Sequence, residues 1–355
     1  MSTERSSSQC LDRGREQSPR IPPPSKVYLA TSQPCNLRCV HCDIYKFKNP
    51  QGELTAEERD RVVDEVGRWD NTIELVLSGG EPFLFKQRVY RIADRAKNIG
   101  ISVSLNTNGT LISGTDIERL PCSGIEGLVV SLDSHEEVVH DQMRGVPGTF
   151  RRASAVIRAL SRSIGKDGFS VSSSSILGAH NLGRIRQLVN YLEELGVAGL
   201  TFQPIQANFM GSDDPRWWEK SPLFPRDSNL VLEGIDTLIE LKRSGRRLYQ
   251  SVQEFEDMRA YLLSPNAIPS EMCASGDNNV MVDGVGNVSL CFFSWRLGLP
   301  TLGNVREMGL QEMWDASSAG ATRALMRRCT FGCGSMACHS RSPSRVFGRL
   351  VVFER

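Results

Sequence analysis

The stretch Thr31-Ser-Gln-Pro-Cys-Asn-Leu-Arg-Cys-Val-His-Cys-Asp43 brings Cys35, Cys39 and Cys42 into one short loop. Their spacing lets the three thiols converge on one metal centre. An iron-sulfur cube has four irons that each take a ligand, so three thiolates leave one iron open to a non-protein ligand. A tetrahedral zinc ion would need His41 as its fourth ligand, and ligation by two adjacent side chains is strained. Spacing alone leaves a cluster, a zinc site and a disulfide open.

Composition places the chain among ordinary globular proteins. Its 355 residues include 42 basic and 41 acidic residues, for a formal net charge of +1. This balance predicts no nucleic-acid partner and no anionic membrane partner. There is no secretory signal and no run long enough to span a bilayer, so we expect a cytoplasmic, reducing compartment in which the ten cysteines serve as metal ligands or buried thiols.

The alternation of short apolar runs predicts an α/β fold. Strands are expected at 27–31, 73–77, 101–105, 127–133, 169–177 and 200–205, with helices between them at 55–69, 89–99, 150–160 and 185–195. Such alternation implies parallel strands joined by right-handed crossovers. We therefore predict a partial (β/α)6 barrel, in which the loops after the strands share one face and form one site.

Changes in composition divide the chain into five segments. Residues 1–25, rich in Ser, Pro and Arg, are expected to form a disordered N-terminal arm. The others are a barrel at 26–207, a loop and helical linker at 208–270, a small cysteine-rich domain at 271–340 and a tail at 341–355.

A second motif, Ser78-Gly-Gly-Glu-Pro82, closes the second predicted strand. By itself it could be an ordinary strand-to-helix turn. Together with the cysteine loop it resembles the radical S-adenosylmethionine (SAM) superfamily. The resemblance implies that the three cysteines hold a 4Fe-4S cluster whose free iron binds SAM. It also implies that Gly79, Gly80 and Glu81 bind the SAM amino group.

Three further residues match the family at later strand ends. Asn106 and Ser131 resemble residues that reach the SAM ribose and carboxylate. Arg144 resembles an arginine that pairs with the SAM carboxylate, although a solvated loop cation is an alternative. His41 stands where the family often has an aromatic residue near the adenine.

The C-terminal cysteines form a second group. Cys273 and Cys291 flank a Gly-rich segment predicted to be a hairpin, and Cys329, Cys333 and Cys338 follow. The group resembles SPASM and twitch extensions, which add auxiliary iron-sulfur clusters. Five cysteines imply one auxiliary 4Fe-4S cluster, with Cys333 or Cys338 as the fourth ligand. A structural zinc ion is the alternative.

The resemblance implies an enzyme that reductively cleaves SAM to a 5'-deoxyadenosyl radical, which abstracts hydrogen from its substrate. We expect flavodoxin or ferredoxin as electron donor. The favoured substrate is a small polar metabolite, such as a sugar, aminocyclitol or nucleoside, that undergoes dehydrogenation, epimerisation or decarboxylation in antibiotic or other natural-product biosynthesis. One alternative is a peptide or protein maturase that forms thioether or carbon-carbon crosslinks. Another is a non-catalytic metal-binding adaptor.

Overall fold

The computed structural model describes residues 21–46, 51–208, 214, 216–265 and 273–335. Within these ranges, six parallel strands follow one another across the sheet in chain order. They are β1 Lys26–Ser32, β2 Glu74–Gly79, β3 Val103–Thr107, β4 Ile125–Ser131, β5 Ser170–Leu177 and β6 Leu200–Pro204. The sheet is open, because β6 forms one of its edges and does not pair with β1. The predicted partial (β/α)6 barrel is thus confirmed.

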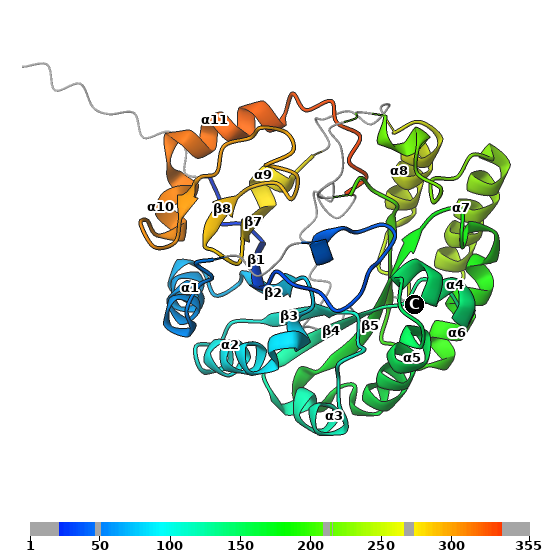
Figure 1. Ribbon diagram of the computed structural model, residues 1–355, viewed down its shortest axis with the longest axis horizontal. Coiled ribbons are helices and arrows are strands. Elements are labelled where there is room, and N and C mark those ends of the chain that lie inside the picture. The colour runs from blue at the N-terminus through cyan, green and yellow to red at the C-terminus, as the bar shows by residue number, and fades with distance from the viewer. Residues whose placement is uncertain (1–20, 47–50, 209–213, 215, 266–272, 336–355) are drawn as a thin grey trace, which may run out of the picture.

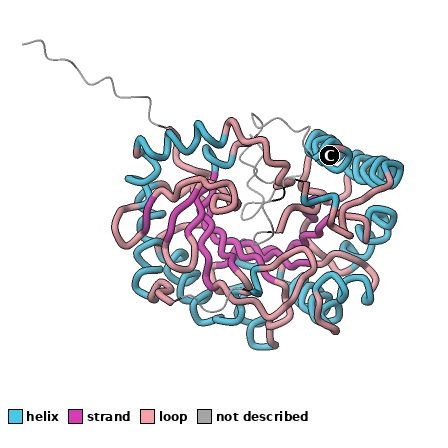
Figure 2. The backbone as a smooth tube through the Cα atoms, turned by 45° about the horizontal axis from the view of Figure 1, so that its top comes forward, coloured by secondary structure: helices cyan, strands magenta, loops and turns pink. Residues whose placement is uncertain are grey.

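Helices cover the convex face of the curved sheet (Figures 1 and 2). They are α1 Ala56–Trp69, α2 Lys86–Asn98, α3 Gly114–Arg119, α4 Glu137–Arg144, α5 Thr149–Leu160 and α6 Ile185–Glu194. The predicted capping box begins α1, where the Thr55 hydroxyl accepts from the Glu58 backbone N–H and the Glu58 carboxylate accepts from Thr55 N–H. The apolar stripe of α1, which includes Val62 and Val66, is buried.

The parallel register brings the candidate residues to one edge of the sheet. Ala30 pairs with Ser78, and Ser131 pairs with Ser174. Because residues in register on neighbouring strands share a face, their side chains line the concave interior. The cysteine loop follows β1, and the Gly-Gly-Glu-Pro segment begins at Gly79, the last residue of β2, so both lie at the carboxyl end of the barrel.

The C-terminal cysteine-rich segment extends the barrel sheet. A hairpin of β7 Asn279–Val282 and β8 Asn287–Ser289 confirms the predicted antiparallel pair. β7 also pairs in parallel with β1, and β9 Gly303–Asn304 completes a nine-stranded sheet in the order β6-β5-β4-β3-β2-β1-β7-β8-β9. The pairing of β7 with β1 joins segments more than two hundred residues apart and was not predicted.

The residues that precede Gly145 form a helix, α4, for which no element was predicted, and the alternative of a solvated loop cation at Arg144 is wrong because Arg144 is buried on this helix. The helix is short and contains adjacent β-branched valines, which lower helix propensity. It forms because His140, Met143 and Arg144 share one buried face, and it ends at Gly145 in the left-handed conformation, with φ 68°.

The remaining helices are α7 Ser228–Arg243, α8 Val252–Leu263, α9 Ser275–Asn278, α10 Leu310–Asp315 and α11 Ser317–Met326. α7 and α8 pack together beside α6, and α9 to α11 lie around the C-terminal hairpin (Figure 1). Among the described residues, every helix is too short or too polar to cross a bilayer.

Candidate functional site

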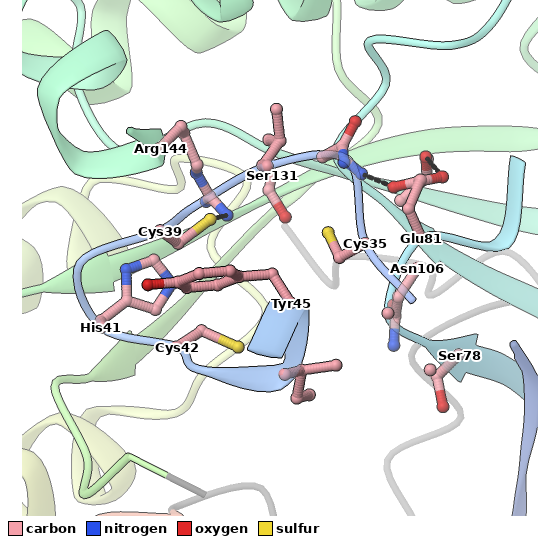
Figure 3. A pocket seen from close by; sticks show the side chains of 16 residues that line it. Cys35, Cys39, His41, Cys42, Tyr45, Ser78, Glu81, Asn106, Ser131 and Arg144 are labelled. Carbon is pink, nitrogen blue, oxygen red and sulfur yellow. Dashed lines mark hydrogen bonds between the residues drawn. The ribbon is translucent and has the colours of Figure 1, made fainter. Parts of the chain in front are cut away.

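Cys35, Cys39 and Cys42 line one pocket at the carboxyl end of the barrel (Figure 3). All three thiols are partly buried. Burial raises the pKa of Cys35 to about 11 and that of Cys42 to about 12, so the metal-free thiols are protonated at neutral pH. Such thiols are poor nucleophiles, and a bound metal deprotonates them. The loop therefore fits a metal centre better than a catalytic cysteine.

Three thiols in one pocket suit a cubic cluster, whose irons sit at separate corners and take one thiolate each, which leaves the fourth iron open. A tetrahedral zinc ion, which holds sulfur at about 2.3 Å, would need a fourth ligand beside the three thiols. Within the described part of the chain, no group of three His, Cys, Asp or Glu side chains is arranged to hold a single metal ion.

Gly79 and Gly80 bring the β2 end directly against the chain that leads to Cys35. Gly80 N–H donates to Ser32 O at 2.9 Å. A Cβ on Gly79, which has φ 126°, would overlap the Ser32 carbonyl oxygen, and a Cβ on Gly80 would overlap that of Pro34. Both glycines line the pocket, so they also permit close approach of a ligand to the backbone.

Glu81 is oriented toward the protein interior and is 1% exposed. Its Oε1 accepts from Phe83 N–H at 3.0 Å and from the Thr107 hydroxyl at 2.7 Å, while Oε2 accepts from Asn108 N–H at 2.8 Å. The carboxylate thus joins the β2 and β3 ends. These three bonds occupy three of its roughly four acceptor positions, and its contact with the SAM amino group stays a prediction.

Replacing Glu81 with glutamine should destabilise the metal-free protein by about 1–3 kcal/mol. Whichever oxygen becomes the amide nitrogen, the backbone N–H of Phe83 or of Asn108 loses its acceptor. Chemical denaturation measures the free energy of unfolding, with Glu118→Gln at an exposed position of α3 as the control. Equal stability of the two variants would contradict the structural role of Glu81.

The other predicted SAM-binding residues also line the pocket. Asn106, Ser131 and Arg144 all contribute to its wall. Three more lining residues, Ser78, Thr107 and Asn108, belong to the strand ends that the sequence indicated but were given no role there. Sequence reasoning missed Leu37, Ile44 and Tyr45 as lining residues. Leu37 lies within the cysteine loop, and Ile44 and Tyr45 follow it directly, so proximity in sequence was their available signal. Contacts of all these residues with a cofactor are predictions.

The C-terminal end of α4 holds the cysteine loop by its backbone. Arg38 N–H donates to Arg144 O at 3.1 Å, and Val40 N–H donates to Met143 O at 2.9 Å. These bonds flank Cys39 on both sides. They also satisfy carbonyls that a helix end leaves without intrahelical partners. Gly145 lies against the same loop, and a Cβ there would overlap the Arg38 carbonyl oxygen.

We expect Gly145→Ala to lower the iron content of the purified protein from about eight toward about four atoms per chain, the difference between two cubic clusters and one. The matched control is Gly148→Ala. Both glycines have positive φ, 68° and 80°, but a Cβ on Gly148 meets nothing within 4 Å. Each variant should lose about 1–2 kcal/mol from left-handed strain. Equal iron content in the two variants would show that the α4 contact does not organise the cysteine loop.

A second pocket gathers the described C-terminal cysteines. Cys273, Cys291, Cys329 and Cys333 line it together. Cys338, the fifth candidate, lies outside the described residues. Four thiols are enough to ligate a cubic cluster completely. We therefore propose these four as the ligands of one auxiliary cluster.

Hydrogen bonds and a packing contact connect the second pocket to the end of the barrel. Gln203, on β6, donates through its side-chain nitrogen to Gly334 O at 2.8 Å, and Trp217 Nε1 donates to Gly332 O at 3.3 Å. Tyr261, fully buried, lies against Gly334. These contacts hold the loop that carries Cys333 over the strands that line the barrel interior.

Two domain families match the chain. Residues 30–192 match the Radical SAM superfamily, and residues 273–338 match an iron-sulfur cluster-binding domain, SPASM. The matched segments contain the cysteine groups of the two pockets.

Three known proteins are similar to this chain over most of its length. The chain is 31% identical over 294 residues to the AdoMet-dependent heme synthase of Methanosarcina barkeri, covering 79% of each protein. It is 28% identical to the mycofactocin maturase MftC of Mycobacterium ulcerans, over 73% of this chain and 66% of the relative. Streptococcus suis SuiB bound to S-adenosylmethionine shares the fold, with a TM-score of 0.66, 15% identity, and coverage of 90% of this chain and 75% of SuiB. The chain therefore belongs to the radical SAM superfamily and carries a C-terminal SPASM iron-sulfur domain.

Proposed function

We propose that this radical SAM enzyme is a peptide maturase, with thioether or carbon-carbon crosslinking as the expected reaction class. The observation that carries the proposal is a row of hydroxyl-bearing side chains in the barrel interior, beyond the cysteine pocket. Ser131, Ser174 and Thr201 pair in register across β4, β5 and β6. Neighbouring strands lie about 4.8 Å apart, so the three residues form a row of hydroxyl-bearing positions. The row begins at Ser131 in the wall of the cysteine pocket and ends at Thr201 on β6, the strand that also carries Gln203.

This row suits a neutral substrate segment. Hydroxyl groups donate and accept, as the amides of a peptide backbone require. The charged groups in the wall of the adjoining pocket, Glu81 and Arg144, are engaged within the protein, Glu81 by three hydrogen bonds and Arg144 by Asp133 at 2.7 Å. A peptide segment can therefore bind without displacing an ion pair.

The cofactors follow from family membership. The radical SAM domain implies a 4Fe-4S cluster and SAM, for which we propose the pocket of Cys35, Cys39 and Cys42, and the SPASM domain implies auxiliary iron-sulfur. When bound, the cluster and SAM would provide the chemistry by which a hydrogen atom is abstracted from an unactivated C–H bond. The barrel orients the reacting groups and excludes water. We propose a flavodoxin or ferredoxin as electron donor and the cytoplasm as the compartment.

The relatives support a peptide more than a sugar or aminocyclitol. Mycofactocin maturase MftC is similar over 73% of this chain. A SuiB structure that shares the fold contains the precursor peptide SuiA, although likeness at 16% identity speaks for the fold alone. The expected small polar metabolite receives no support from these relatives.

A second candidate is modification of an iron-bound tetrapyrrole. It is favoured by the 31% identity to an AdoMet-dependent heme synthase over 79% of the chain. This alternative predicts that an iron porphyrin binds tightly and shifts its absorption spectrum on binding.

Mass spectrometry of reconstituted enzyme under anaerobic conditions separates the candidates. The probes are synthetic peptides encoded by short reading frames beside the gene, iron coproporphyrin III and an aminocyclitol, each incubated with SAM and dithionite. The proposal predicts a mass change in a peptide, together with 5'-deoxyadenosine. The Cys39→Ala enzyme, which lacks a cluster ligand, is the control. A mass change confined to the porphyrin or the aminocyclitol would overturn the proposal.

A further inference from the structure

A buried arginine lies between the cysteine loop and a buried carboxylate. Arg144 is 7% exposed and Asp133 is fully buried. Arg144 Nε lies 2.7 Å from Asp133 Oδ2, and Nη1 of the same guanidinium donates to Cys39 Sγ at 3.9 Å. Figure 3 shows Arg144 pointing at the Cys39 sulfur across the edge of the pocket.

Asp133 is fixed by β5, and it fixes Arg144 in turn. Its Oδ1 accepts from Ile176 N–H at 3.0 Å, and its backbone carbonyl accepts from the Asn181 side chain at 2.9 Å. Burial alone would raise the pKa of Asp133, yet Arg144 holds that pKa well below its usual range. The pair is therefore ionised at neutral pH, and the guanidinium is held in one orientation.

Backbone hydrogen bonds also fix the position of Arg144 relative to Cys39. Arg144 is the last residue of α4, whose final carbonyls bind Arg38 N–H and Val40 N–H on either side of Cys39. The side chain and the main chain of one helical turn thus converge on a single cysteine. Gly145 permits this contact, because any side chain there would overlap the Arg38 carbonyl.

We propose that Arg144, oriented by Asp133, is a positioning residue that donates to the Cys39 thiolate and raises the reduction potential of the N-terminal cluster. Hydrogen bonds to cluster sulfurs and nearby positive charge stabilise the reduced, more negative state. This role differs from pairing with the SAM carboxylate, because it acts on the cluster before SAM binds. It does not depend on the substrate proposed above.

The test is the reduction potential of the SAM-free N-terminal cluster, measured by redox titration monitored by electron paramagnetic resonance. The background is the full chain with Cys273→Ala and Cys291→Ala, so that the N-terminal signal is observed alone. Arg144→Gln should lower the potential. Arg38→Gln is the matched control, since it removes an equal charge one residue from Cys39 but at an exposed position, where solvent screens it. It should leave the potential unchanged.

SAM affinity, measured on the same proteins, separates the two roles of Arg144. If Arg144→Gln weakens SAM binding tenfold or more while the SAM-free potential is unchanged, Arg144 serves SAM alone and the proposal is overturned. If Arg144→Gln does not assemble its cluster, Arg144→Lys is measured instead. A lysine keeps the charge but lacks the planar fork that reaches Asp133 and Cys39 together, so its potential should also fall. A potential equal to that of the parent protein would again overturn the proposal.

Discussion

Replacing Cys39 with alanine should abolish cleavage of SAM, lowering 5'-deoxyadenosine formation at least a thousandfold. Cys39 is one of the three thiols in the N-terminal pocket, and a cubic cluster that has lost a ligand there has two open irons instead of one. Cys39 is also the cysteine that α4 holds on both sides. The measurement is chromatographic quantification of 5'-deoxyadenosine after anaerobic incubation with SAM and dithionite.

Cys291→Ala is the matched variant, since Cys291 lies in the other pocket. It should reduce iron from about eight to about four atoms per chain, retain SAM cleavage and stop modification of the substrate. Equal loss of SAM cleavage in the two variants would refute the assignment of separate tasks to the two pockets.

Replacing Gly80 with alanine should have nearly as large an effect without removing any ligand. A Cβ on Gly80 would overlap the carbonyl oxygens of Gln33 and Pro34, which belong to the backbone just before Cys35. Backbone atoms cannot rotate away as a flexible side chain can. The loop must shift, and Cys35 shifts with it. We expect loss of the N-terminal cluster, measured as a fall in iron from about eight to about four atoms per chain, and loss of SAM cleavage.

Gly114→Ala is the control for Gly80→Ala. Gly114 is the first residue of α3, and a Cβ there meets nothing within 4 Å. Alanine at this position should leave iron content unchanged and stabilise the helix by up to about 1 kcal/mol. Full iron content in Gly80→Ala would show that the cysteine loop tolerates displacement and that tight packing of the two motifs is not required.

The barrel and its cysteine pocket were predictable because their signals are local. The spacing of Cys35, Cys39 and Cys42 is contained in one loop, and each strand is a short apolar run that can be recognised alone. Parallel strands bring their carboxyl ends together, so the amino-acid sequence alone was enough to assign Gly80 and Ser131 to the same site.

The remaining features depend on contacts between distant segments. Asp133 lies two residues after the predicted site residue Ser131. Its role, however, depends on contacts with Arg144 and with Ile176 from the next strand. The addition of β7 to β1 requires a pairing that no local pattern encodes. The inward orientation of Glu81 depends on Thr107 and Asn108 at the end of β3, and therefore on the sheet register.

The central claim is that three protein thiolates hold a cubic cluster whose fourth iron is ligated by SAM. Electron-nuclear double resonance with SAM labelled at its amino nitrogen tests this most directly, with the reduced cluster in the Cys273→Ala and Cys291→Ala background. The account predicts a nitrogen coupling from the labelled group and a changed spectrum when SAM is added. A spectrum that SAM leaves unchanged, with no coupling to the label, would contradict it.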